Sequence, residues 1–233
     1  MNRETKQIFL IAILFLFSCK PQKPVHQYLE EFNNPESDNI MVVAHRGSHK
    51  EYVENSVSAI KHAISLGVEI IEVDVKVTKD NVPVLNNDKK INRTTDGTGD
   101  PEAYNWNELQ KFNLKLPDGT IIDEKMASLE EVLKIAKGQV IIDIDIKTDR
   151  LKPIVDIVKK TGTSHQVIFF HNDFNVLKEI KELLPEAIIM PLPFSFQMTE
   201  SALKLFSPKV VHINQSINQP EITSLIRENK ARI

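Results

Sequence analysis

The sequence predicts an α/β fold built on a parallel β-sheet. Three observations lead to this prediction. Apolar runs of strand length alternate with amphipathic helical patterns along most of the 233 residues. Two of those runs carry the same unusual pattern of charges, and one segment, 92–126, interrupts the alternation. Strands that alternate with helices are joined by right-handed crossovers, so they are expected to lie parallel in one sheet.

The elements can be placed one by one. Strands are expected at 41–44, 69–77, 140–146, 167–170, 187–190 and 210–213, and residues 231–233 are expected to begin a seventh. Helices are expected at 55–66, 151–160, 174–184, 199–206 and 220–229. Asn55 is the expected N-cap of the first helix, and Gly67 stands where a helix-ending glycine belongs.

The second and third strands alternate apolar with charged residues. Successive side chains on a strand point to opposite faces, so Glu72 and Asp74 share one face of the first. Asp143, Asp145 and Lys147 likewise share one face of the second. Carboxylate oxygens are hard ligands that suit Mg²⁺ or Ca²⁺. The pattern therefore indicates a metal site, or alternatively two edge strands that show their charges to solvent.

Short motifs follow one another in a fixed order along this framework. They are His-Arg-Gly at 45–47, Glu-Asn at 54–55, Glu-x-Asp at 72–74, Thr-Lys-Asp at 78–80, Asn-Asp at 87–88, Asn-Arg-Thr-Thr at 92–95 and Asp-Ile-Lys at 145–147. This order resembles the glycerophosphodiester phosphodiesterase family, densely over 45–99 and again at 128–133 and 145–147. The resemblance implies a TIM-type (β/α)₈ barrel of the phospholipase-C-like phosphodiesterase type. Such a barrel has eight strands, so we expect the last one or two to be missing here.

The resemblance also implies chemistry. It implies a metal-dependent hydrolase of glycerophosphodiesters that uses one divalent cation, Mg²⁺ or Ca²⁺, on a small-molecule or lipid-derived phosphodiester. The residues that it assigns are Glu72, Asp74 and Asp145 as metal ligands, Arg46 and Lys147 as phosphate contacts, and Glu54 as support for the substrate-binding groups. It further implies that the insertion at 92–126 lies near the substrate mouth. We expect most of that insertion to be a surface segment with a small core around Trp106.

Acid–base catalysis is where the sequence departs from the family pattern. His45 matches one catalytic histidine, but Asn87 stands where the family has the second. An amide does not titrate near neutrality, and general acid–base catalysis contributes about 10²–10⁴-fold. His171 or His49 could substitute for the missing group. A further departure is Asp145, which replaces a family glutamate and is shorter by about 1.5 Å.

These departures leave three functions open. The chain could be a glycerophosphodiester phosphodiesterase with slowed turnover. It could be a catalytically impaired lipoprotein that binds phosphodiesters or polyol phosphates, the reading that Asn87 favours. It could also be a related phosphodiesterase that acts on lipids by intramolecular transfer.

The amino-terminal residues predict export. Residues 1–18 combine Arg3 and Lys6 with an apolar run at 8–17, as in a signal peptide. Residues 16–19 resemble a lipobox, which makes Cys19, the single cysteine, the expected lipidation site. We expect residues 19–39 to be a tether, residues 40–233 to be the barrel, and the protein to be lipid-anchored in a bacterial cell envelope on the periplasmic or outer-surface side. Without residues 1–18 the chain has 27 basic and 31 acidic residues, which gives no footprint for nucleic acid.

Overall fold

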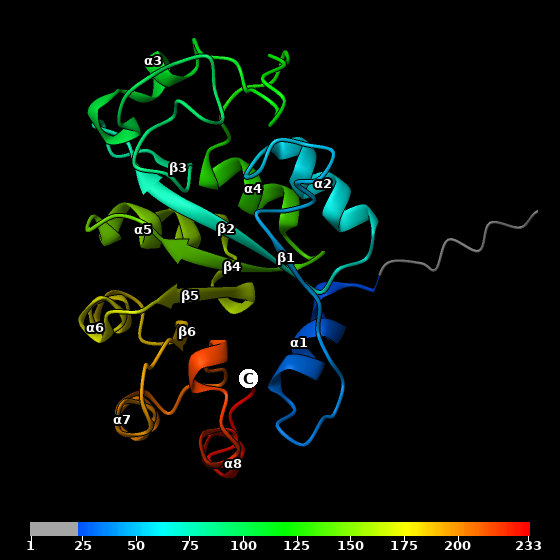
Figure 1. Cartoon of the computed structure of the whole chain (residues 1–233), viewed down its shortest axis with the longest axis vertical. Helices are drawn as coiled ribbons and strands as arrows, with labels where there is room; N and C mark the ends of the chain where they lie inside the picture. The colour runs from blue at the N-terminus through cyan, green and yellow to red at the C-terminus, as the bar shows by residue number, and fades with distance from the viewer. Residues whose placement is uncertain (1–22) are drawn as a thin grey trace, which may run out of the picture.

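A curved, mainly parallel sheet lies at the centre of the computed structural model, which describes residues 23–233 (Figure 1). Its order is β1-β2-β4-β5-β6, with β3 antiparallel beside β2. The strands are β1 (Val43–His45), β2 (Ile70–Val77), β3 (Pro83–Leu85), β4 (Ile141–Ile146), β5 (Val167–His171) and β6 (Ile188–Pro191). The fold is of the TIM-barrel type, although in the described residues the sheet does not close, because β1 pairs with β2 alone.

Helices cover the outer face of this sheet (Figure 1). They are α2 (Val57–Ser65), α4 (Leu129–Ala136), α5 (Leu151–Thr161) and α6 (Phe174–Leu183). Beyond β6, α7 (Phe196–Phe206) and α8 (Pro220–Glu228) pack with each other and with the run at 210–213. The main core lies between helices and strands, and Ile71, Val73 and Val75 of β2 are fully buried there. The five expected helices are present within a few residues. The sequence analysis did not identify α4, although Ser128 caps it by accepting a hydrogen bond from the Glu131 backbone N–H.

The expectation of a sixth strand at 210–213 is wrong. This run forms one parallel bridge, Val210 to Arg232, rather than a regular strand. The His212 backbone N–H still donates to the Pro191 carbonyl at the end of β6, at 3.0 Å. A regular strand needs a continuous ladder of hydrogen bonds to its neighbours. On the side away from β6, this run forms hydrogen bonds only with Arg232 among the described residues. The run therefore continues the curvature of the sheet without a full ladder.

A helix occupies most of the segment expected to be a tether. In α1 (Val25–Asn33), Val25, Tyr28 and Phe32 are buried. They pack against residues at or next to the starts of four strands, Ile70, Ile141, Ile168 and Ile188. This i, i+3, i+7 spacing is that of an amphipathic helix, and the expectation of a tether is wrong for these residues. Because α1 covers the starts of the strands, it closes the amino end of the barrel.

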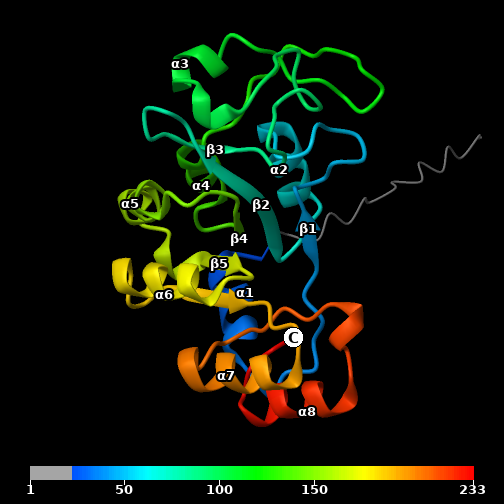
Figure 2. The ribbon, with the colours of Figure 1, turned by 60° about the vertical axis from the view of Figure 1, so that its left-hand side comes forward.

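The insertion after β3 packs on a core of its own. Its regular elements are η1 (Pro101–Ala103) and α3 (Trp106–Leu109), and Figure 2 shows them at one end of the molecule beyond β3. Buried Ile91, Leu109 and Met126 form the centre of this core, and Trp106 packs against them. The small core expected around Trp106 is present. Among residues 23–233, every helix is too short or too polar to cross a membrane.

Candidate active site

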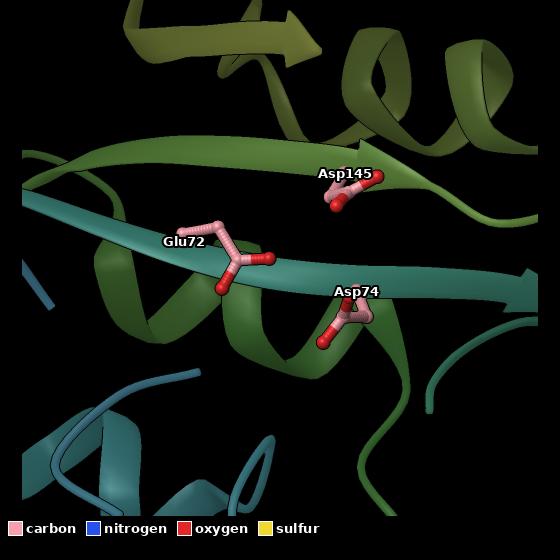
Figure 3. Close-up of side chains that lie close together, drawn as sticks. All are labelled: Glu72, Asp74 and Asp145. Atoms are coloured by element: carbon pink, nitrogen blue, oxygen red, sulfur yellow. The ribbon is translucent and has the colours of Figure 1, made fainter. Parts of the chain in front are cut away.

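The site begins with the register of β2 and β4. Glu72 lies beside Asp143, and Asp74 lies beside Asp145, as paired residues of adjacent parallel strands. The isoleucine and valine residues between them face the helices, so all the carboxylates face the lumen. Figure 3 shows Glu72, Asp74 and Asp145 leaving the two strands on the same side. Each of these three offers a ligand oxygen, and the three oxygens lie within 4.8 Å of one another.

This carboxylate cluster, Glu72 with Asp74 and Asp145, fits a divalent cation. Burial, and then the negative charge of Asp74, raises the pKa of Glu72 from 4.5 to about 8. Asp74 is 1% exposed as a side chain, and its Oδ1, which lies 3.4 Å from Lys147 Nζ, accepts no hydrogen bond among the described residues. Hard oxygens that repel one another and have a free lone pair are the environment that Mg²⁺ or Ca²⁺ relieves.

Asp143 lies beside Glu72, one residue pair deeper in the lumen than Asp74 and Asp145. It is buried, and its Oδ1 also has no hydrogen-bond partner among the described residues. Burial, followed by the charges of Glu72 and Asp145, raises the pKa of Asp143 well above its usual value. It lines a lumen cavity of about 700 Å³. Asp143 therefore lies beside Glu72 but is not one of the three residues of the carboxylate cluster.

Lys147 supplies positive charge beside the cluster. Its Nζ lies 2.6 Å from Asp145 Oδ2 and 3.4 Å from Asp74 Oδ1. Burial alone would lower the pKa of Lys147, but the hydrogen bond to Asp145 and the charges of both aspartates raise it. Lys147 is therefore charged and lies on the same face as the carboxylates. Lys76 follows Asp74 on β2 and donates to the Lys147 carbonyl at 3.0 Å.

Arg46 joins β1 to the same cluster. Its backbone φ is +57°, in the left-handed region that non-glycine residues seldom adopt. In this conformation its backbone N–H donates to Glu72 Oε2 at 2.8 Å. Its guanidinium places Nε 3.1 Å from Asp74 Oδ2 and Nη1 2.9 Å from Glu54 Oε1. Backbone strain of this kind is found at functional sites that hold it in place.

Asn55 holds Asp74 at two points. Its Nδ2 donates to Asp74 Oδ2 at 2.8 Å, and its Oδ1 accepts the Asp74 backbone N–H at 3.1 Å. The expectation that Asn55 caps α2 is wrong, since Ser56 is the N-cap and accepts the Ala59 N–H. Asn55 instead has a φ of +58°, a conformation that asparagine tolerates better than most residues. The sequence analysis used Asn55 only as an expected cap and as part of the Glu-Asn motif, and neither use indicates its contact with Asp74.

Arg93 comes from the insertion and reaches the same group of residues. Its Nη1 and Nη2 each donate to an oxygen of Glu54 at 2.7 Å, and its Nε donates to Asp88 Oδ2 at 2.7 Å. Burial alone would raise the pKa of Glu54, but hydrogen bonds from Arg93 and the charge of Arg46 hold it below its usual value. The sequence analysis used Arg93 only as part of a motif, because nothing local shows a partner 39 positions away.

Comparison with known proteins identifies the family. Residues 45–232 match the sequence model described as the glycerophosphoryl diester phosphodiesterase family. The chain belongs to this family.

Relatives and solved structures agree with the assignment. A glycerophosphodiester phosphodiesterase from Caldanaerobacter subterraneus subsp. tengcongensis is 29% identical over 153 residues, covering 62% of this chain and 63% of that protein. The chain thus spans less than two thirds of that relative. A glycerophosphoryl diester phosphodiesterase structure from Parabacteroides distasonis superposes with a TM-score of 0.76, 25% identity and coverage of 90% and 75% of the two chains. A phosphodiesterase from Oleispira antarctica, in complex with the product sn-glycerol-3-phosphate, gives 0.71 at 23% identity, covering 82% of each.

The two positions predicted for acid–base catalysis, His45 and Asn87, differ in that only His45 carries a group that can titrate. His45 ends β1, with Nε2 3.9 Å from Glu72 Oε2 and a side chain that is 62% exposed. Partial burial, followed by the positive charge of Arg46, lowers the pKa of His45, so it is neutral near pH 7. Asn87 donates from Nδ2 to Asp88 Oδ1 at 2.9 Å and is partly buried.

The two substitute histidines lie at the same end of the barrel. His49 shares a loop with His45, and its Nδ1 lies 2.7 Å from the His45 carbonyl oxygen. His171 ends β5, where its Nδ1 accepts the Asp173 backbone N–H at 2.9 Å. Nearby, burial raises the pKa of Asp145, and the hydrogen bond and charge of Lys147 lower it in part. Of the two, His171 is the one that lies on the side of β4.

Proposed function

We propose that this chain is a metal-dependent phosphoric diester hydrolase that acts on glycerophosphodiesters. One observation carries the proposal, namely three carboxylates within 4.8 Å of one another, flanked by Arg46 and Lys147 at the carboxyl ends of parallel strands. Catalytic groups of TIM-type barrels lie at that end. Membership of the phosphodiesterase family supports the same reaction class.

Glu72, Asp74 and Asp145 would hold the cation, and we propose Mg²⁺ or Ca²⁺ because all the donors are carboxylate oxygens. When bound, the cation would neutralise the charge that grows on the non-bridging phosphate oxygens. The side chain of Asp145 is one carbon shorter than glutamate, yet β4 brings it into the cluster. Asn55 keeps the Asp74 carboxylate oriented.

Arg46 and Lys147 would bind the phosphate. The Arg46 guanidinium can donate two parallel hydrogen bonds to phosphate oxygens, while Lys147 acts as a point charge. Both lie within ion-pair distance of Asp74, so a phosphate bound between them would stand beside the carboxylate cluster. The Oleispira antarctica phosphodiesterase is in complex with a phosphomonoester product, which supports a ligand of this size.

His45 would carry the proton transfers. It is neutral near pH 7 and exposed at the mouth, so it can accept a proton from an attacking oxygen. Asn87 can orient the leaving oxygen by a hydrogen bond but cannot protonate it. We therefore propose an enzyme with reduced turnover on substrates that have poor leaving groups.

The experiment is a discontinuous assay with purified protein and glycerophosphocholine. It measures release of sn-glycerol-3-phosphate with Mg²⁺, with Ca²⁺ and with a chelator. Metal-dependent release supports the proposal, and Asp74→Asn serves as the inactive control. Accumulation of a cyclic phosphate would instead indicate intramolecular transfer.

A second candidate is a binding protein for phosphodiesters or polyol phosphates. The observation that favours it is the Asn87 amide, which is hydrogen-bonded to Asp88 in the place of a titrating histidine. This candidate predicts calorimetric binding of glycerophosphocholine without any product after prolonged incubation. We rank it second because His45, the carboxylate cluster and the positively charged side chains of Arg46 and Lys147 are all in place.

We also propose that the protein is exported and lipid-anchored through Cys19, on the periplasmic or outer-surface side of a bacterial cell envelope. Cys19 and the signal-peptide residues 1–18 lie outside the described residues, so this proposal depends on the lipobox-like sequence at 16–19. The amino end of the barrel, where α1 lies, is opposite to the carboxyl ends of the strands. An anchor that precedes α1 would leave the mouth of the site facing away from the membrane.

A further inference from the structure

Charged side chains of opposite sign alternate without a break from the insertion to β4. In order they are Asp88, Arg93, Glu54, Arg46, Asp74, Lys147 and Asp145, and each consecutive pair lies within 3.4 Å. We call this set the charge chain. Its inner end is the carboxylate cluster, and its outer end is the loop that carries Asn87.

Along the charge chain, burial is greatest at Asp74 and least at Arg93. The Arg93 side chain is 50% exposed, Glu54 is 14% exposed and Asp74 is 1% exposed. Isolated surface ion pairs contribute little, but bidentate geometry in a network is the recognised exception. Arg93 donates to both oxygens of Glu54 and to both oxygens of Asp88, so the geometry is of that kind.

The position of Arg46 depends on Glu54. Glu54 Oε1 accepts from Arg46 Nη1 at 2.9 Å and from Arg93 Nη2 at 2.7 Å. Without Arg93, Glu54 would lose the two hydrogen bonds that fix the plane of its carboxylate. Arg46 Nε already lies 3.1 Å from Asp74 Oδ2, so a loosened Glu54 would leave the Arg46 guanidinium to pair with Asp74 alone instead of being shared between the two carboxylates.

We propose that Arg93 is a positioning residue for phosphate recognition, acting through Glu54 on Arg46 and through Asp88 on the loop that carries Asn87. The proposal rests on the proposed function of the site. Arg93 does not touch the carboxylate cluster in this arrangement. Its role is to keep the Arg46 guanidinium held between Glu54 and Asp74, where a phosphate can reach it, and to hold the segment 86–88 in place through Asp88.

The test compares Arg93→Gln and Arg93→Lys with a matched control, Arg150→Gln. Arg150 also links the insertion to the barrel, because it lies 3.6 Å from Glu102 and donates to the carbonyls of Val77 and Thr78, but it has no part in the charge chain. Three quantities are measured in each protein: the calorimetric Kd for sn-glycerol-3-phosphate with Mg²⁺, the water exchange of the Arg46 Nε–H by NMR, and Tm.

Both Arg93 variants should weaken sn-glycerol-3-phosphate binding about tenfold or more, as expected for loss of a charge-assisted contact. Arg93→Lys should not rescue binding, since an ammonium cannot hold two carboxylates bidentately. The Arg46 Nε–H should exchange faster in both. Arg150→Gln should leave Kd and the Arg46 signal unchanged even if Tm falls.

The proposal is overturned if Arg93→Gln lowers Tm while Kd and the Arg46 exchange rate stay at their wild-type values. If the wild-type protein neither binds sn-glycerol-3-phosphate nor releases it, the proposed function fails separately. In that case the exchange rate of the Arg46 Nε–H alone tests whether Arg93 positions Arg46. Faster exchange in Arg93→Gln supports the proposal, and unchanged exchange refutes it.

Discussion

Asparagine 87 lacks the one property that its position requires in an acid–base pair. Its amide already donates to Asp88, so it is ordered but cannot release a proton. We expect Asn87→His to raise glycerophosphodiester hydrolysis by about 10²-fold, the lower end of what general acid catalysis contributes. Initial rates with glycerophosphocholine and with a nitrophenyl phosphodiester would check this, because the gain should be large only for the poor leaving group.

His45→Ala is the companion variant, since it removes the remaining titrating group of the pair. It should abolish activity in both the wild type and Asn87→His. Should Asn87→His gain nothing while His171→Ala or His49→Ala is inactive, another histidine acts in place of residue 87.

Glutamate 72 should give the metal-free protein an unusual dependence of stability on pH. The folded state raises the pKa of Glu72 from 4.5 to about 8, so between these values it holds a proton that the unfolded chain releases. The free energy of unfolding contributed by this group is therefore highest below about pH 4.5 and falls as pH rises toward 8. Urea titrations across this range, in chelator, should show the decline.

The variant Glu72→Gln is the control for that decline, because glutamine does not titrate. It should be more stable than wild type near pH 8 in chelator, and its stability should change less across the range. Added Mg²⁺ or Ca²⁺ should stabilise wild type but not the variant. An identical pH dependence in the two proteins would show that other groups cause it.

Among the elements, α1 should contribute strongly to stability. Phe32 is 3% exposed and belongs to the apolar cluster at the starts of the strands. Phe32→Ala should lower the free energy of unfolding by about 3 kcal/mol, as for a phenylalanine removed from a core. Chemical denaturation measures the change, and His26→Ala on the exposed side of α1 is the matched control. Equal effects of the two variants would mean that α1 is not part of the folded core.

The elements that the sequence predicted well are those with a clear period. The paired strands β2 and β4 were placed to within a residue because apolar and charged residues alternate strictly. The helix α1 was missed because its apolar stripe of Val25, Tyr28 and Phe32 lies in a polar, proline-containing segment. The run 210–213 has strand composition, but its neighbour 231–233 is too short to give it a ladder.

Across the whole molecule, the sequence located the carboxylate cluster but not its support. Glu72, Asp74 and Asp145 could be predicted to converge because strand alternation and adjacent parallel pairing are local rules. Asn55 and Arg93 could not, since their partners are chosen by loop geometry across 19 and 39 positions. Charge pairing at that range becomes visible only when the barrel brings β1, β2 and the insertion together.

The proposed lipid anchoring at Cys19 can be tested on the whole protein. If the Cys19 thiol carries the lipid, the Cys19→Ser variant should lose its membrane anchor and appear in the soluble envelope fraction. Fractionation of cells that express either form, followed by immunoblotting, measures the distribution. Variant protein that still sediments with membranes would contradict lipid anchoring at this residue.

The pairing of Glu72 with Asp143 and of Asp74 with Asp145 has a consequence for how the barrel folds. A one-residue slip of β4 along β2 would turn its aspartates toward the helices, where desolvation of unpaired carboxylates costs several kcal/mol each. A two-residue slip keeps the faces but sets Lys147 beside Asp74, which replaces a pair of like charges by a pair of opposite charges. In the absence of metal, the two-residue slip is therefore the misalignment that charge opposes least. In the native alignment Glu72, Asp74 and Asp145 bring three ligand oxygens together, so a divalent cation bound there would stabilise the correct pairing of β2 with β4 during folding.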